Sequence, residues 1–176
     1  YDGNGKKIDL SFFSKATYKL NAKFSLFGDL QLRLLNYKTT GLNSDRTPLI
    51  IDKKYSFFNP KAGITYLFNK QNNFYFSYAR ANREPNKDDF EANVNIKPEQ
   101  LNDFELGWRY NDGNTKMNSN LYYMFYNEQL VLTGALDDVG SPIRANSGKS
   151  YRLGLELDAQ FQIHKQFAIQ PAIAFS

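Results

Sequence analysis

Residues 150–163 alternate between apolar side chains and polar or small ones. One face would carry Tyr151, Leu153, Leu155, Leu157, Ala159, Phe161 and Ile163, and the other Arg152, Gly154, Glu156, Asp158, Gln160 and Gln162. Because the side chains of a strand point alternately to its two faces, this period predicts a strand with one apolar and one polar face. At about 3.3 Å per residue it would extend some 45 Å, whereas strands of soluble proteins commonly reach about 17–20 Å. The pattern therefore predicts an unusually long strand.

The same period of two recurs along most of the chain. In one segment, for example, Leu30 and Leu32 alternate with Gln31 and Arg33. Since a period of two fixes which side chains share a face, each such segment is interpreted as a strand. The predicted strands, roughly eight, cover residues 8–20, 23–38, 54–68, 74–82, 101–111, 116–133, 149–163 and 167–176.

The breaks between these strands alternate in length. Short breaks, rich in turn formers, fall at residues 21–22, 69–73, 112–115 and 164–166, and long breaks at about 39–53, 83–100 and 134–149. Bacterial transmembrane barrels show this alternation, with short periplasmic turns and longer extracellular loops. The sequence thus predicts an all-β fold, an antiparallel up-and-down transmembrane β-barrel segment whose apolar face contacts lipid. Pro60 and Pro171 lie within predicted strands and indicate a bulge or a strand end.

Composition excludes several other classes of protein. The longest apolar run, Leu121–Tyr126, is far shorter than the roughly 18 residues of a spanning helix. The net charge of +4 is spread along the chain, so no nucleic-acid partner is expected. The first residues, Tyr1–Lys7, contain no apolar signal core, so any export signal was removed or belongs to a longer parent.

Residues suited to catalysis or metal binding are sparse. The chain has no cysteine and one histidine, His164, which is expected to be a plain turn residue. The acidic pairs Asp88–Asp89 and Asp137–Asp138 lack the spacing of a calcium loop and are expected to be solvated. We therefore expect no catalytic residues, no metal site, no cofactor and no enzymatic activity.

Five segments resemble, in order, the barrel of TonB-dependent outer-membrane receptors, especially the iron-complex receptor type of Bacteroides-like bacteria. They are Phe58–Tyr66, Phe74–Phe90, Lys97–Gly107 with its "KPE…ELG" pattern, Asn120–Tyr126 and Asn146–Leu157. Each segment alone is a weak sign of the family. All five in the family's order, with the same alternation of short turns and long loops, are fairly specific for it. The resemblance covers most of the chain from Phe57 onward and, weakly, the part before it.

The resemblance implies a barrel of about 22 strands closed around an N-terminal plug, in the outer membrane of a Gram-negative bacterium. Residues 1–176 would be part of the barrel, roughly a third of it, with the plug domain and the TonB-contacting segment absent. The chain ends within a predicted strand, so the parent would pair both open edges. The implied function is active transport of a scarce ligand, above all an iron-siderophore complex, with energy supplied through TonB. The implied partners are outer-membrane lipid, the plug domain and TonB.

Two other functions are compatible with the residues themselves. A small complete barrel of about eight strands could act as an anchor, adhesin or pore. A soluble lipocalin-like binder would have its apolar face inside instead of outside.

Ligand contact is expected in the long loops, above all in Arg83–Asn95, with Tyr126–Ser147 second, because loops on a rigid scaffold can vary and carry specificity. The candidate ligand-binding residues are Arg83, Glu84, Asn86 and Asp88, which follow a strand end. Arg83 is the first of them, since a guanidinium offers a fork of donors to carboxylate or catecholate oxygens. The alternative is that Arg83 ties the loop to its neighbour.

Overall fold

The computed structural model describes residues 4–42, 46–136, 140 and 142–176, and it consists almost entirely of antiparallel strands. The strands are β1 (Asn4–Lys19), β2 (Phe24–Leu42), β3 (Pro48–Leu67), β4 (Asn72–Arg83), β5 (Glu99–Asn111), β6 (Thr115–Asn127), β7 (Leu130–Leu136), β8 (Pro142–Asn146), β9 (Lys149–His164), β10 (Phe167–Ile169) and β11 (Ala172–Phe175). A single short helix, α1 (Lys87–Ala92), follows β4 in the described residues. The predicted antiparallel β fold is confirmed.

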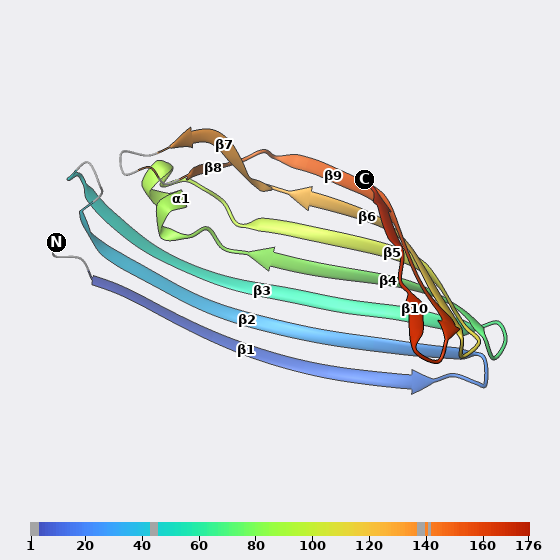
Figure 1. Cartoon of the computed structure of the whole chain (residues 1–176). Coiled ribbons are helices and arrows are strands. Elements are labelled where there is room, and N and C mark those ends of the chain that lie inside the picture. The colour runs from blue at the N-terminus through green and yellow to red at the C-terminus, as the bar shows by residue number, and fades with distance from the viewer. Residues whose placement is uncertain (1–3, 43–45, 137–139, 141) are drawn as a thin grey trace.

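The long strands form one curved wall (Figure 1) in the order β1-β2-β3-β4-β5-β6-β9-β10, with β11 also paired to β9. The predicted strands pair with their neighbours along the chain as expected, and both parts of the segment 167–176, β10 and β11, pair with β9. Between β6 and β9 the chain forms a separate two-stranded sheet, β7-β8, so β6 pairs with β9. Figure 1 shows α1 and the β7-β8 sheet at one end of the wall and the short turns at the other. No helix in the described ranges is both long and apolar enough to cross a membrane.

Several predicted strand boundaries are wrong. The segment 116–133 is not one strand, because Glu128 has a positive φ of 52° and separates β6 from β7. The segment 167–176 divides at Pro171 into β10 and β11, as a proline there suggested. Pro60 neither ends β3 nor creates a bulge, and its register with Leu30 of β2 is regular. β2 and β3 also extend well into the predicted long break at 39–53.

The four short turns share one local device. A side-chain acceptor within two residues of the end of the preceding strand binds backbone N–H groups further along, which is how Asn and Asp favour turns. Asn21, Asn69 and Asp112 each accept two such bonds, from the residues two and three positions on, at 2.7 to 3.0 Å. At the fourth turn, the Nδ1 atom of His164 accepts from the backbone N–H of Gln166 at 3.4 Å. His164 is the last residue of β9 and not part of the turn itself, which consists of Lys165 and Gln166, so the predicted break begins one residue too early.

The registers divide the wall into two faces. One face, which α1 covers and which we call the inner face, carries Gln31, Arg33, Arg152, Glu156 and Asp158. On it, the Nδ2 atom of Asn118 donates to the Asp158 carboxylate at 2.7 Å. The other, outer face carries Leu30, Leu32, Leu153, Leu155, Leu157 and Phe161, each opposite an apolar or aromatic residue of at least one neighbouring strand. The predicted sharing of faces is confirmed.

The outer face is apolar over a limited height only. Leu30 and Leu153, for example, leave 51% and 55% of their surface exposed, far more than apolar side chains of a soluble core. This band, which we call the apolar belt, covers outward residues from 24 to 34 in β2 and from 151 to 161 in β9. Beyond it, toward the end of the wall where α1 lies (the upper end), polar residues enter the outward positions, with Asn36 opposite Lys54 and Arg80 opposite Asn102. About 9–11 residues suffice for a tilted strand to span a membrane, so β2 and β3 continue beyond the belt.

Two glycines let aromatic rings lie flat against the inner face. A Cβ atom at Gly107 would lie 2.0 Å from the ring of Tyr75, and one at Gly154 would lie 2.3 Å from the Tyr122 hydroxyl oxygen. In both cases the glycine is the direct register partner of the tyrosine on the neighbouring strand. Glycine at these positions therefore permits a close approach that any other residue would prevent. The guanidinium of Arg109 in turn lies 4.2 Å from the Tyr75 ring centroid.

Candidate functional site

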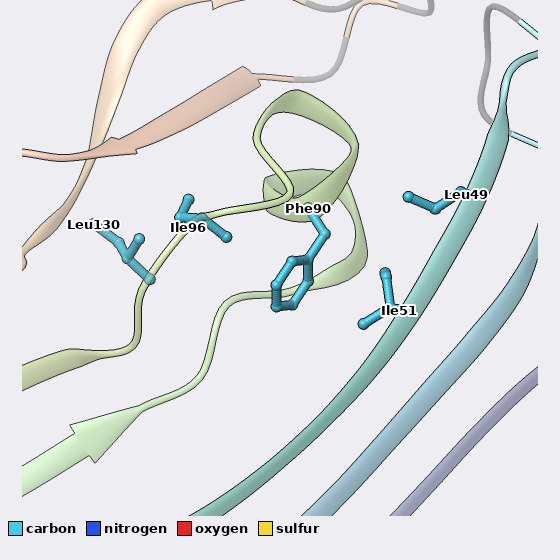
Figure 2. Packing of buried hydrophobic residues seen from close by; sticks show 5 residues of the cluster. All are labelled: Leu49, Ile51, Phe90, Ile96 and Leu130. Atoms are coloured by element: carbon cyan, nitrogen blue, oxygen red, sulfur yellow. The ribbon is translucent and has the colours of Figure 1, made fainter.

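The connection between β4 and β5, residues 84–98, folds back onto the inner face of the wall (Figure 2). Phe90 of α1 and Ile96 pack against Leu49 and Ile51 of β3 and against Leu130 at the start of β7. All five side chains are buried, and only 1% of Phe90 is exposed. The ring of Tyr37 adds a tilted contact with Phe90 at 6.2 Å between centroids. These residues form a small core that fixes the loop beyond the upper edge of the apolar belt.

The loop fits here because β3 and β4 separate. Their pairing begins at Lys61 and Ala79, so the remainder of β3 toward Pro48 pairs with β2 alone. Amide side chains bridge the start of the gap, since Asn82 donates to the side-chain oxygen of Asn59 at 2.7 Å and to the Phe58 carbonyl at 3.4 Å. Asn59 in turn donates to Gln31 at 2.9 Å. The loop and α1 then pack on the inward side chains of β3 above this bridge.

Local hydrogen bonds define the start of α1. The side chain of Asn86 accepts from the Asp89 backbone N–H, and the Asp89 carboxylate accepts from the Asn86 backbone N–H, both at 2.8 Å. This reciprocal pair is a capping box, which satisfies donors that a helix N-terminus otherwise leaves free. Asp89 is 3% exposed and also faces the guanidinium of Arg144 in β8 at 3.5 Å. The helix is thereby attached to the β7-β8 hairpin.

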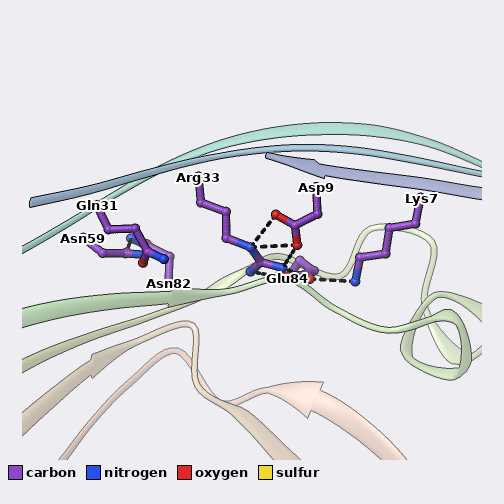
Figure 3. A network of polar contacts seen from close by, with 7 residues as sticks. All are labelled: Lys7, Asp9, Gln31, Arg33, Asn59, Asn82 and Glu84. Atoms are coloured by element: carbon purple, nitrogen blue, oxygen red, sulfur yellow. Dashed lines mark hydrogen bonds and ion pairs between the residues drawn. The ribbon is translucent and has the colours of Figure 1, made fainter. Parts of the chain in front are cut away.

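An ionic network joins the loop to the first two strands (Figure 3). Arg33 of β2 donates to the Glu84 carboxylate through Nη1 at 2.6 Å and Nη2 at 2.8 Å, and its Nε donates to Asp9 of β1 at 3.0 Å. Lys7 completes the network with an ion pair to Glu84 at 2.8 Å. Burial by itself raises the pKa of the Glu84 carboxyl, but hydrogen bonds from Arg33 and Lys7 outweigh this effect and lower the pKa from 4.5 to about 2.

The depressed pKa of Glu84 makes the attachment of the loop dependent on pH. Because the folded-state pKa is lower than the unfolded one, the ionised carboxylate stabilises the docked loop above about pH 4.5, and this contribution is lost as the pH falls toward 2. At pH 7, Glu84→Gln should weaken docking by about 1–2 kcal/mol. Hydrogen exchange of the amides in residues 84–98 would measure this weakening.

Glu128→Gln is the matched control for Glu84. The Glu128 carboxylate pairs with Lys97 at 2.8 Å, but the two side chains are 34% and 64% exposed, so the loss should stay below about 1 kcal/mol. Equal exchange in the Glu84 and Glu128 variants would contradict a role of the ionic network in docking.

The structure gives the four predicted ligand-binding residues different surroundings. The Nη2 atom of Arg83 binds the Glu99 carboxylate at 3.2 Å and the Leu130 carbonyl at 3.3 Å, yet 53% of the side chain is exposed. Glu84 belongs to the ionic network, Asn86 caps α1, and Asp88 is exposed in its first turn. Of the acidic pairs, Asp88–Asp89 is only half solvated because Asp89 is buried, and Asp137–Asp138 lies outside the described residues.

Sequence reasoning missed the partners that the wall contributes to this loop. Lys7, Asp9 and Arg33 are inward residues of β1 and β2, and only the register between strands brings them to Glu84. A hollow of about 380 Å³ between β1, β2, β3 and α1 is bordered by Gly5, Tyr37, Thr39, Leu49 and Lys87, among others, but not by Lys7, Asp9 or Arg33. No cluster of three or more residues suited to binding a metal occurs among the described parts of the chain.

Comparisons with known proteins agree with this architecture. Residues 1–176 match the family model described as "TonB dependent receptor-like, beta-barrel". Among solved structures, the copper transporter OprC has a TM-score of 0.77 at 16% identity over 95% of this chain. The ferric-catecholate import receptor Fiu from K12 E. coli has a TM-score of 0.65 at 17% identity over 99%. The ferric yersiniabactin uptake receptor FyuA from Yersinia pestis has a TM-score of 0.68 at 17% identity over 98%.

The chain spans 29% of the OprC chain, 29% of Fiu and 27% of FyuA. No curated protein sequence matches it. At these identities the solved structures establish the fold, and the match over the whole chain establishes the family. The chain therefore belongs to the TonB-dependent receptor β-barrel family and is part of an outer-membrane protein of a Gram-negative bacterium.

Proposed function

We propose that this chain is part of the barrel wall of an active transporter whose extracellular inner surface binds an iron-siderophore complex. The complete receptor would enclose a plug domain and receive energy through TonB, and the chain itself would perform no covalent chemistry. The apolar belt would contact lipid, and the polar inner face would surround the plug and the transport path. Residues 1–176 would then be one segment of a larger closed barrel.

The observation that carries the proposal is the inward fold of residues 84–98. This loop covers the inner face where β2 and β3 extend past the apolar belt, and a core of buried residues and an ionic network hold it there. A loop that only covered the outside of a barrel would not be anchored to inward side chains. Loops fixed on a rigid scaffold in this way can present side chains to a ligand.

Charge and the named relatives support an iron-siderophore ligand. Arg83 is the last residue of β4, and 53% of its side chain is exposed. Lys7, on the inner face of β1, is 48% exposed. Such cations suit the carboxylate or catecholate oxygens of an anionic iron chelate. Solved structures with this fold include receptors described for ferric catecholate and for ferric yersiniabactin.

The four candidate residues would have two roles, contact with the ligand and positioning of the loop. Arg83 and Asp88 have exposed side chains and would contact the ligand. Glu84 and Asn86 are committed to the ionic network and the helix cap, so they would position the loop. The donors of Arg83 other than Nη2 form no hydrogen bond within the described residues, which leaves part of the guanidinium fork for an anion.

Arg83→Ala in the intact receptor is expected to weaken binding of a ferric siderophore by about tenfold or more, because charge-assisted hydrogen bonds to an anion are strong. Uptake and equilibrium binding in cells, normalised to surface expression, would measure the loss. Arg80→Ala is the matched control, since Arg80 lies on the same strand with its side chain on the outer face. Unchanged binding by the Arg83 variant at normal surface expression would reject the contact, and reduced surface expression would favour a structural tie.

A further inference from the structure

One edge of β3 is unpaired over the upper half of the strand. The ladder between β3 and β4 ends at Lys61 and Ala79, and from there toward Pro48 β3 pairs only with β2. Figure 1 shows β3 and β4 separating toward the end of the wall where α1 lies. A strand edge is therefore open within the wall, on the side of β3 that faces β4.

The open backbone groups belong to the even-numbered residues of β3. In an antiparallel ladder, consecutive residues direct their N–H and C=O groups to opposite sides. The Leu67 N–H donates to the Lys23 carbonyl, next to β2, at 2.7 Å, whereas the Phe58 carbonyl accepts from the side chain of Asn82 in β4. The register between β2 and β3 is regular throughout. Odd-numbered residues thus face β2, and even-numbered residues face the open side.

Four residues make up this edge: Ile50, Asp52, Lys54 and Ser56. Their backbone groups on the open side have no partner within the described ranges. All four residues are exposed, and 74% of Ile50 is accessible to solvent. At about 3.3 Å per residue, the edge extends some 20 Å, which is the length of an ordinary strand.

The chain's own sequence keeps β4 from closing the edge. Pro60 is an even-numbered residue, so the N–H that it lacks would have donated toward Arg80, its partner if the ladder continued. Extending the register further would place Asp88 opposite Asp52, and like charges in that position are unfavourable. After Arg83 the chain instead turns to the inner face. The edge therefore stays open to a strand from elsewhere.

We propose that this edge binds an extended segment of another protein at the cell surface, which adds a strand to β3. A second strand supplies donors and acceptors at the spacing of the open groups, and its alternate side chains provide specificity. Residues 84–98 pack on the inward side chains Leu49 and Ile51, so the outward side of the edge stays accessible. The interaction is independent of the ligand that the receptor transports.

The outward side chains of the edge indicate which segment fits. Lys54 is exposed and has no ion pair in the part of the chain that the structure describes, whereas Asp52 is paired with Lys38 at 2.8 Å. Opposite charges and apolar pairs across antiparallel strands are favourable. The segment should therefore place a carboxylate opposite Lys54, a polar residue opposite Asp52 and a β-branched apolar residue opposite Ile50. In an antiparallel strand these positions follow one another at every second residue.

Backbone methylation of a peptide tests the added strand. The probe is a fluorescent peptide of nine residues, all threonine except for glutamate at its third position and valine at its seventh. Fluorescence anisotropy with the intact receptor in detergent should show saturable binding. Methylating the backbone nitrogens of the third and fifth residues, which would donate to β3, should weaken binding by about tenfold. The matched control is methylated at the fourth and sixth residues, whose N–H groups would point away, and should bind like the original peptide.

A charge exchange tests the register. Lys54→Glu should weaken binding of the glutamate peptide by about fivefold, and a peptide with lysine at its third position should restore the affinity. Lys6→Glu makes the same change on the outer face of β1 and should have no effect. The proposal is overturned if no peptide binds saturably, if both methylation patterns weaken binding equally, or if the exchanged peptide restores nothing. A receptor dimer that Lys54→Glu dissociates would assign the edge to a second copy and would also overturn it.

Discussion

Leu155→Arg is expected to destabilise the intact receptor in lipid vesicles by about 2–4 kcal/mol, because it places a charge on the lipid face near the middle of the membrane. Leu155 lies between Leu121 of β6 and Phe175 of β11 on the outer face, so no polar partner is near. A urea titration of the receptor folded in vesicles would measure the change in the free energy of unfolding.

Gln160→Arg, on the same strand, is the control on the inner face. Gln160 lies opposite Lys116, so an arginine there would meet a like charge at a cost of about 0.2–1 kcal/mol. The loss should therefore be clearly smaller than that at Leu155. Equal losses at the two positions would contradict the assignment of the faces to lipid and lumen.

Phe90→Ala is expected to release residues 84–98 from the wall. The ring is the largest side chain of the small core and is almost fully buried, and removing such a ring commonly costs about 3–5 kcal/mol. Because the ring belongs to a loop and not to the sheet, most of the loss should appear as local opening. Hydrogen exchange and limited proteolysis should show faster opening of this loop with the barrel intact, and ligand affinity should fall with it.

Val94→Ala separates the packing of Phe90 from a general effect of changing the loop. Val94 belongs to the same loop, but 59% of it is exposed, so its truncation should change loop stability by less than about 0.5 kcal/mol. If Phe90→Ala left the exchange of residues 84–98 unchanged, the small core would not be what holds the loop.

The two faces of the wall could be predicted from sequence because period-two alternation is a local signal. Residues 150–163 alternate in the sequence and form β9 with the expected sidedness. The turns were predictable for the same reason, since Asn21, Asn69 and Asp112 act on their own neighbours. Localisation followed from the pattern of long and short breaks together with the family resemblance.

The arrangement of the site could not be predicted because it depends on long-range register. Nothing near Arg33 in sequence identifies Glu84 as its partner, 51 residues away. The helix had a local signal that was missed, because Asn86 followed three residues later by Asp89 is a capping pattern. The break at Glu128 depends on a left-handed backbone at a residue type that seldom adopts it, so no propensity rule indicates it.

The most direct test of the account is the depth and sidedness of β9 in the membrane. The chain contains no cysteine, so single cysteines can be introduced into this segment one at a time at positions 152, 153 and 155 to 158, including Arg152→Cys and Leu153→Cys, and labelled with a fluorophore. Gly154 is left unchanged because a Cβ atom there would collide with Tyr122. In vesicles of the intact receptor, brominated lipid should quench labels at 153, 155 and 157, and an aqueous quencher should act on those at 152, 156 and 158. Quenching without this alternation, or with the two sets reversed, would contradict a membrane-spanning wall with its apolar belt in lipid.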